Sequence, residues 1–126
     1  MDSEISISLD IGQPLDFAST LESGQAFRWR RRGDWYYGVV LDDLVALKQD
    51  GSRLEVRSSS PRPDQLESTL RDYFRLDDDL DAIYSCIDTD PLMHDAIAAY
   101  RGLRILRQDP WECLVGFICS ANSNIP

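Results

Sequence analysis

The residues best suited to chemistry are scarce in this chain, whose 126 residues include one lysine, Lys48, and one histidine, His94. Lys48 stands in an alternating stretch just before Gln49-Asp50-Gly51, which predicts a strand that leads into a hairpin. The motifs G-x-S-x-G, H-E-x-x-H and G-x-G-x-x-G and the P-loop are all absent from the sequence. Conventional sites for acyl transfer, zinc proteolysis and nucleotide binding are therefore excluded.

The three cysteines, Cys86, Cys113 and Cys119, form no C-x-x-C pair. Because a structural zinc site needs four ligands at short spacings, we expect no metal. Cys113 and Cys119 lie on an apolar helical stretch and are expected to be small buried core residues. The acidic run Asp77-Asp78-Asp79 lacks the spacing and the glycine of a calcium loop, so we expect the solvated start of a helix.

The net charge of −9 argues against nucleic acid as a partner, because neutralising phosphates requires lysine and arginine. The basic residues are unevenly placed, however. One group occupies Arg28-Trp29-Arg30-Arg31-Arg32, and a second comprises Arg101, Arg104 and Arg107. Such a patch can bind phosphate on an acidic protein. It can equally be the solvated face of a strand, paired with acids, and both interpretations stay open.

The first half of the chain is patterned as an antiparallel sheet. Alternation predicts strands at residues 5–10, 26–30, 35–41 and 44–48, and around Leu54 and Val56, with turns at Arg32-Gly33-Asp34 and Asp50-Gly51. Residues 14–17 are too short to assign.

Helices are predicted after the Pro-rich loop at 58–64. Leu66, Leu70, Tyr73 and Phe74 form one apolar stripe. A second helix is expected around residues 80–87. A third should begin at Asp90-Pro91 and stop near Gly102, with Leu92, Met93, Ile97 and Tyr100 on its buried side.

A last helix should begin at Asp109-Pro110, with Glu112 placed as in a capping box. Its side chains are so apolar that it needs burial on more than one side, and the chain ends soon after it. We therefore expect an incomplete helical domain. No segment is long and apolar enough to span a membrane, and no secretion signal is evident, so an intracellular protein is expected.

Three segments, in order, resemble the 8-oxoguanine DNA glycosylase family. They are Ser23-Gly24-Gln25-Ala26-Phe27-Arg28-Trp29, Tyr73-Phe74-Arg75-Leu76-Asp77, and the run from Leu106-Arg107-Gln108-Asp109-Pro110 to Ser120-Ala121-Asn122-Ser123-Asn124-Ile125. The match in order and spacing is far more specific than one short motif.

This resemblance implies an α+β fold: a twisted antiparallel sheet with flanking helices, similar to half of a TATA-binding protein. We expect this unit over residues 1–88. Residues 89–126 would be the first helices of a truncated all-α domain that carries a helix-hairpin-helix in this family. The agreement with the strand and helix pattern above is independent of the resemblance.

The resemblance also implies roles for individual residues. Gly24 matches the glycine whose carbonyl reads the lesion, and Gln25 and Phe27 would support the pocket. Asn122 matches the wedge that fills the space left by the flipped base and bonds the opposite cytosine, with Asn124 beside it. Phosphate contacts could come from Arg28, Arg30 and Arg107, although Arg107 could instead hold the Asp109 turn.

The family removes the base with a lysine amine, through a Schiff base, assisted by an aspartate. Lys48 does not match that lysine, so both groups are expected beyond residue 126, and this chain alone is expected to be inactive. The implied partner is double-stranded DNA containing oxidised purine opposite cytosine, bound by a monomer without a cofactor. The alternative is a standalone, non-catalytic acidic interaction domain, which the charge and the missing lysine favour.

Overall fold

The computed structural model describes residues 4–26, 28–59 and 62–120. It contains the strands β1 (Ile5–Asp10), β2 (Arg30–Arg32), β3 (Trp35–Val40), β4 (Asp43–Asp50) and β5 (Arg53–Ser58). The helices are α1 (Phe17–Leu21), α2 (Pro63–Tyr73), α3 (Leu80–Ile87), α4 (Pro91–Ala99) and α5 (Pro110–Ser120). This is the α+β class that the sequence predicts.

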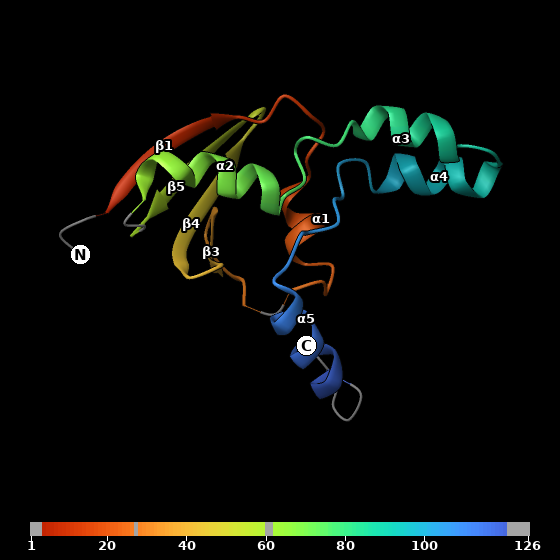
Figure 1. Ribbon diagram of the computed structural model, residues 1–126. Coiled ribbons are helices and arrows are strands. Elements are labelled where there is room, and N and C mark those ends of the chain that lie inside the picture. The colour runs from red at the N-terminus through yellow and green to blue at the C-terminus, as the bar shows by residue number, and fades with distance from the viewer. Residues whose placement is uncertain (1–3, 27, 60–61, 121–126) are drawn as a thin grey trace.

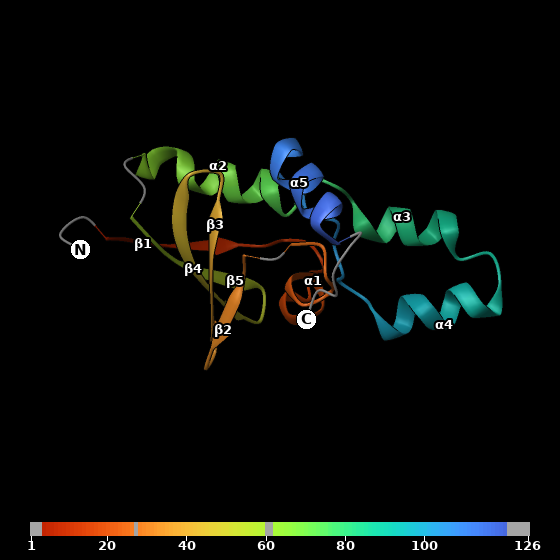
Figure 2. The same ribbon diagram turned by 90° about the horizontal axis from the view of Figure 1, so that it is seen from below.

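The strands form one antiparallel sheet in the order β1-β5-β4-β3-β2. Tight turns join β2 to β3, β3 to β4 and β4 to β5, whereas β1 pairs with β5 across the intervening hairpins. Helix α2 lies across one face of the sheet (Figures 1 and 2). We call this covered side the inner face and the opposite side the outer face.

The core fills the space between α2 and the inner face. Leu66, Leu70, Tyr73 and Phe74 of the α2 segment are all buried, as their stripe predicts. Phe74 meets Phe17 of α1 with ring centroids 5.1 Å apart, and Phe17 meets Tyr36 of β3 edge-on at 5.7 Å. The short helix α1, which sequence patterning left unassigned, begins at the N-cap Asp16, whose carboxylate accepts from the Ser19 N–H at 3.2 Å.

Trp29 explains why the predicted strand at 26–30 starts only at Arg30. Its indole turns inward, is 8% exposed, and donates from Nε1 to the Tyr73 hydroxyl at 3.0 Å. A Cβ on Gly38 would lie 2.5 Å from this ring, so only glycine on β3 admits it. Burial raises the pKa of Tyr73. The prediction of a strand through residues 28 and 29 was therefore wrong, because inward packing of Trp29 wins over pairing.

Helices α3 and α4 run side by side and extend away from the sheet in both views, and α5 projects from the body in Figure 1. The two predicted N-caps are confirmed: the carboxylates of Asp90 and Asp109 accept from the Met93 and Glu112 N–H groups at 2.9 and 3.1 Å. Helix α3 is capped in the same way by Asp79, whose carboxylate accepts from the Ala82 N–H at 3.1 Å. The run Asp77–Asp79 is the expected exposed helix start.

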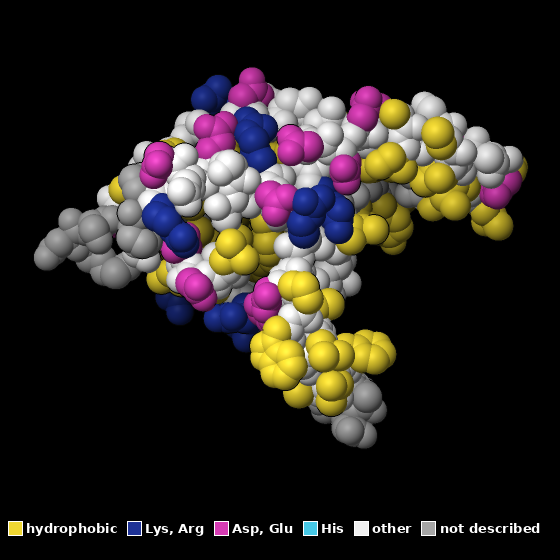
Figure 3. All heavy atoms as spheres, in the orientation of Figure 1, with side chains coloured by type: hydrophobic (Ala, Val, Ile, Leu, Met, Phe, Trp, Pro, Cys, Tyr) yellow, Lys and Arg dark blue, Asp and Glu magenta, His cyan; other side chains and the backbone are white. Residues whose placement is uncertain are grey.

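The predicted burial of the apolar side of α4, and of Cys113 and Cys119 on α5, was wrong. Leu92 is 84% exposed, Tyr100 60% and Met93 37%, and Ile97 is only partly covered. The thiols of Cys113 and Cys119 are exposed as well. Figure 3 shows hydrophobic side chains gathered over α5 and along α3 and α4. Apolar periodicity predicts which side of a helix is suited to burial. Among the described residues, however, no second layer of helices or strands covers these sides.

Candidate nucleic-acid interface

The loop after α1 turns at Gly24, which is exposed and has φ +87°. This left-handed backbone favours glycine, because a Cβ there crowds the following carbonyl. Among the described residues, apart from its two chain neighbours, no atom lies within 4 Å of the position that a Gly24 Cβ would occupy. The backbone at Gly24 therefore borders open space, which leaves room for a ligand to approach it closely.

The side chain of Gln25 fastens this loop to a segment some 80 residues later. Its Nε2 donates to the Arg104 carbonyl at 2.7 Å, and its Oε1 accepts from the Leu106 N–H at 2.9 Å. Nε2 also lies 3.1 Å from Ser23 Oγ within the loop. Both ends of the amide are thus engaged by the chain itself, so Gln25 positions the loop rather than offering its amide to a ligand.

Arg104 anchors the same segment in the interior of the protein. It is 3% exposed, and its guanidinium donates to the Pro14 carbonyl at 2.8 Å and to the Arg75 carbonyl at 2.7 Å. Its N–H donates to Thr20 Oγ1 at 3.1 Å. Burial lowers the pKa of this guanidinium, yet arginine stays protonated because its usual pKa is so high. Through its backbone and its guanidinium together, this one residue ties the loop, α1 and the end of α2 to one another.

The segment then leads directly into α5. Gln108 Nε2 donates to the Gln25 carbonyl. Arg107 donates its N–H to the Tyr73 carbonyl at 2.8 Å, and its guanidinium pairs with Asp72 at the end of α2. Its ion-pair partner is thus Asp72 and not the Asp109 turn. The start of α5 is consequently fixed relative to the Gly24 loop.

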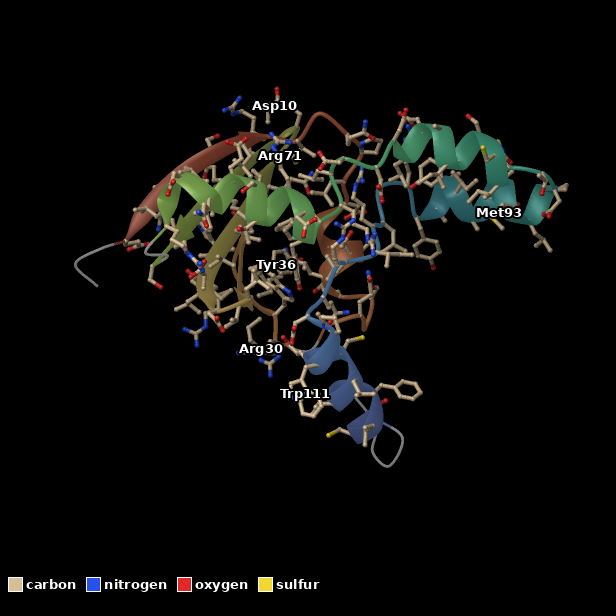
Figure 4. All side chains as sticks on the ribbon, in the orientation of Figure 1. Asp10, Arg30, Tyr36, Arg71, Met93 and Trp111 are labelled. Carbon is tan, nitrogen blue, oxygen red and sulfur yellow. The ribbon has the colours of Figure 1, made fainter. Side chains whose placement is uncertain are left out.

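Arg28 meets the first turn of α5. Its Nη1 lies 3.4 Å from Glu112 Oε1, so this carboxylate pairs with Arg28 instead of completing a capping box. A hollow of about 550 Å³ opens between the β3–β4 turn and α5. Its lining combines charged and apolar side chains: Arg28, Leu41, Asp42, Asp109, Trp111, Glu112, Val115 and Gly116. Trp111 lies on the outside of α5, whereas Tyr36 is within the body (Figure 4).

Residues 7–114 match the family model described as the 8-oxoguanine DNA glycosylase N-terminal domain. The chain belongs to this family. It is 36% identical over 116 residues to the N-glycosylase/DNA lyase OGG1 of Arabidopsis thaliana, covering 88% of this chain. The described family thus agrees with the resemblance carried by the Gly24, Tyr73 and Asp109 segments.

Two solved structures from Clostridium acetobutylicum extend the match to the fold. Its 8-oxoguanine glycosylase/lyase in the apo form is 30% identical, with a TM-score of 0.86, and covers 96% of this chain and 42% of that one. The same enzyme with double-stranded DNA containing cytosine opposite 8-oxoG gives 30% identity and a TM-score of 0.81 over 90% of this chain and 39% of that one. This chain spans 32% of the length of the Arabidopsis relative.

Several residues that the sequence singled out come together around the segment 104–112. Gly24 and Gln25 lie on the loop that is hydrogen-bonded to this segment. Arg107 belongs to the segment itself, and Arg28 pairs with Glu112 at its end. Arg30 lies apart on β2, where its Nη1 donates to the Trp29 carbonyl at 3.2 Å. Phe27, Asn122 and Asn124 lie outside the described residues.

Sequence reasoning missed the roles of Thr20, Arg104 and Gln108. Arg104 was noticed only as part of a cationic group, although its guanidinium donates hydrogen bonds to backbone carbonyls inside the protein. Nothing local marks these residues, because their partners lie as far as 91 residues away in the chain. Within the part that the structure describes, no cluster of His, Cys, Asp or Glu could hold a metal ion, and no helix there is long and apolar enough to cross a membrane.

Proposed function

We propose that this chain supplies the lesion-reading loop and the wedge helix of a DNA glycosylase/AP lyase that removes 8-oxoguanine opposite cytosine. The observation that carries the proposal is the match, at a TM-score of 0.81, to a family member solved with DNA containing that base pair. The rigid link between the Gly24 loop and the start of α5 supports it, because reading a flipped base and filling its place require two groups at a fixed separation.

Gly24 is the proposed lesion reader. 8-Oxoguanine carries a proton at N7, where guanine has an acceptor, so a backbone carbonyl distinguishes the two bases. The open space beside Gly24 would let a base approach, and the Gln25 amide would hold the loop steady. Phe27 would line the pocket next to it.

Asn122 and Asn124, which follow α5 in the sequence, are the proposed wedge residues. An amide offers a donor and an acceptor in one plane, which suits the edge of the unpaired cytosine. Arg28, Arg30 and Arg107 are the proposed phosphate contacts. For Arg28 and Arg107 the acidic partners Glu112 and Asp72 would have to share the guanidinium with the DNA.

The nucleophile is proposed to lie outside this chain. Lys48 is on β4, on the sheet rather than near the Gly24 loop, and its ammonium sits 6.0 Å from the centre of the Trp35 ring. In a protein of the relatives' length, a lysine and an aspartate elsewhere would break the glycosidic bond and nick the strand without a metal or organic cofactor. The exposed side of α5 would then pack against further helices.

The same proposal covers organisation and location. Residues 1–88 would form the sheet unit and residues 89–126 the start of the helical unit, in a monomer. Work on genomic DNA would place the protein in the cytoplasm of a prokaryote or in the nucleus of a eukaryote.

Gly24→Ala, with Gly33→Ala as its matched control, tests the lesion reader. Both glycines have positive φ, +87° and +62°, and neither Cβ would meet an atom of a described residue within 4 Å beyond its chain neighbours. The two changes therefore introduce similar strain of about 1–2 kcal/mol. Binding is measured by fluorescence anisotropy on duplexes that differ only in 8-oxoguanine or guanine opposite cytosine. We expect Gly24→Ala alone to reduce the preference for the lesion, by about tenfold or more.

Equal preference in Gly24→Ala and in the unchanged chain would contradict the lesion-reading role. Binding that shows no preference for the lesion in any variant, and no dependence on salt, would favour the alternative of an acidic interaction domain.

The wedge residue is tested by comparing Asn122→Ala with Asn124→Ala. The same binding assay is used, and the base opposite the lesion is varied.

A further inference from the structure

The outer face of the sheet gathers cations on a strongly acidic protein. Antiparallel register places directly paired residues on the same face. One row runs across the strands as Ser6, Arg57, Ala46, Tyr37 and Arg30. On the neighbouring row, Ser8 pairs with Glu55, Glu55 with Lys48, and Trp35 with Arg32. These two rows carry Arg30, Arg32, Lys48 and Arg57 against the single carboxylate of Glu55, although the whole chain has a net charge of −9. The next row of the same face, Asp10, Arg53 and Asp50, adds one cation and two carboxylates, so the face as a whole keeps more cations than carboxylates.

Five arginines elsewhere in the described chain are engaged by groups close to them. Four of them form ion pairs with carboxylates: Arg28, Arg71, Arg101 and Arg107. The guanidinium of Arg104 donates to backbone carbonyls instead. The outer face differs, because the ion pairs formed within residues 4–26, 28–59 and 62–120 include none of Arg32, Lys48, Arg53 and Arg57. In a chain with 22 acids and 13 bases, cations without carboxylate partners concentrated on one face leave a local positive potential.

Aromatic rings stand among these cations. Tyr37 is 40% exposed, and Trp35 is partly exposed. The Arg57 guanidinium lies 4.6 Å from the centre of the Trp35 ring and the Lys48 ammonium lies 6.0 Å from it. These contacts hold the two cations beside the ring without neutralising them. Arg30 projects away from the body at the β2 edge of the same face (Figure 4).

We propose that the outer face of the sheet is a second nucleic-acid site, which binds single-stranded polynucleotide. The cations would neutralise phosphates, and the exposed Tyr37 ring would take an unstacked base. Interleaved aromatic rings and cations on an open surface are the general means of holding single strands. A duplex keeps its bases stacked and offers them no face, and an acidic peptide would leave the rings without a planar partner.

This site is independent of the proposed lesion-reading loop, since it shares no residue with it other than Arg30. It would hold a strand exposed near a lesion, or RNA, while the Gly24 loop and α5 address duplex DNA. The two proposals can therefore fail separately.

The charge test uses the full chain and a fluorescein-labelled oligothymidylate of about 12 nucleotides, within the usual site size. The variant is Lys48→Glu with Arg57→Glu. Its matched control, Arg71→Glu with Arg101→Glu, makes the same change in charge at ion-paired residues off the sheet. Four cations predict a slope of log K against log salt of about −3, at roughly −0.7 for each phosphate. We expect the sheet variant to halve this slope and to weaken binding at least tenfold, and the control to change little.

Equal loss in the sheet variant and its control would overturn the proposal, because attraction would then follow net charge alone. Competition by polyglutamate as effective as that by unlabelled oligothymidylate would overturn it too, in favour of an acidic protein partner. Circular dichroism and thermal unfolding check that each variant is folded, which the exposure of Arg57 and Arg101 and the partial exposure of Lys48 and Arg71 make feasible.

The stacking test is Tyr37→Ala, with Tyr100→Ala as control, since Tyr100 on the end of α4 is 60% exposed. Losing one base–aromatic stack costs about fivefold or more in affinity for oligothymidylate. We expect that loss for Tyr37→Ala alone and no change in its binding to lesion-containing duplex. Unchanged binding of oligothymidylate by Tyr37→Ala would overturn the single-strand assignment.

Discussion

Helices α2 and α5 have the same length, 11 residues, and opposite surroundings. The apolar side of α2 disappears against the sheet, with Leu66 and Leu70 at 1% and 0% exposure. Helix α5 is the more apolar in sequence, yet Trp111 and Phe117 are 71% and 72% exposed. Apolar character therefore does not decide burial here; the presence of a facing layer does. In the described chain that layer exists for α2 and not for α5.

The difference between the two helices is measured most directly by truncating one phenylalanine at each of them. Phe74→Ala removes a ring that is 0% exposed and packs on Phe17, so we expect a loss of about 3–5 kcal/mol in the free energy of unfolding. Phe117→Ala removes an exposed ring from α5 and should stay within about 0.5 kcal/mol of zero. Urea denaturation followed by circular dichroism measures both. A large loss for Phe117→Ala would show that α5 is covered in solution.

Two arginines of the segment between α4 and α5 show the same contrast between a buried and an exposed position. Arg104→Met leaves the Pro14 and Arg75 carbonyls without their donors, and we expect a loss of about 2–3 kcal/mol in the free energy of unfolding. Arg101→Met removes only an exposed pair with Asp81, where we expect about 0–1 kcal/mol. The same denaturation experiment compares them. Equal effects would mean that Arg104 is a surface cation rather than an anchor.

The smallest effect concerns the link between α3 and α4. The hydrogen bond from the His94 ring to Asp88 raises the pKa of His94 above its usual value. A raised folded-state pKa stabilises the protein below the unfolded pKa of about 6.5, and this contribution is lost as pH rises through the folded pKa. His94→Gln should therefore melt lower than the unchanged chain at acidic pH and at the same temperature near pH 8. A difference that grows with pH would contradict this.

Strands β1, β3, β4 and β5 and helix α2 could be predicted from sequence, because each carries its own alternation or stripe and its own turn residues. The N-caps Asp90 and Asp109 were predicted from equally local signals. The sequence could not predict which elements pack against one another. Periodicity marks the apolar side of α4 and α5 without saying whether a partner is near, and it could not foresee that Trp29 would leave the strand to pack on Gly38.

The candidate site shows the same division. Gly24, Gln25 and Arg107 were found through motifs that resemble a family. Arg104 and Thr20 carry no pattern of their own, since their meaning lies in contacts between residues 84 apart in the chain. Motif resemblance finds the residues at the surface of a site, whereas the residues that hold it in place become visible only in three dimensions.

The Gln25 clamp also bears on how the protein is made. Its partners Arg104 and Leu106 are 79 and 81 residues further along the chain. At a synthesis rate of about 5–20 residues per second, Gly24 would leave the catalytic centre of the ribosome roughly 4–16 seconds before those partners exist. The β2–β3, β3–β4 and β4–β5 hairpins can pair during that interval. The loop proposed to read damage would thus be among the last parts of this fold to take shape during translation.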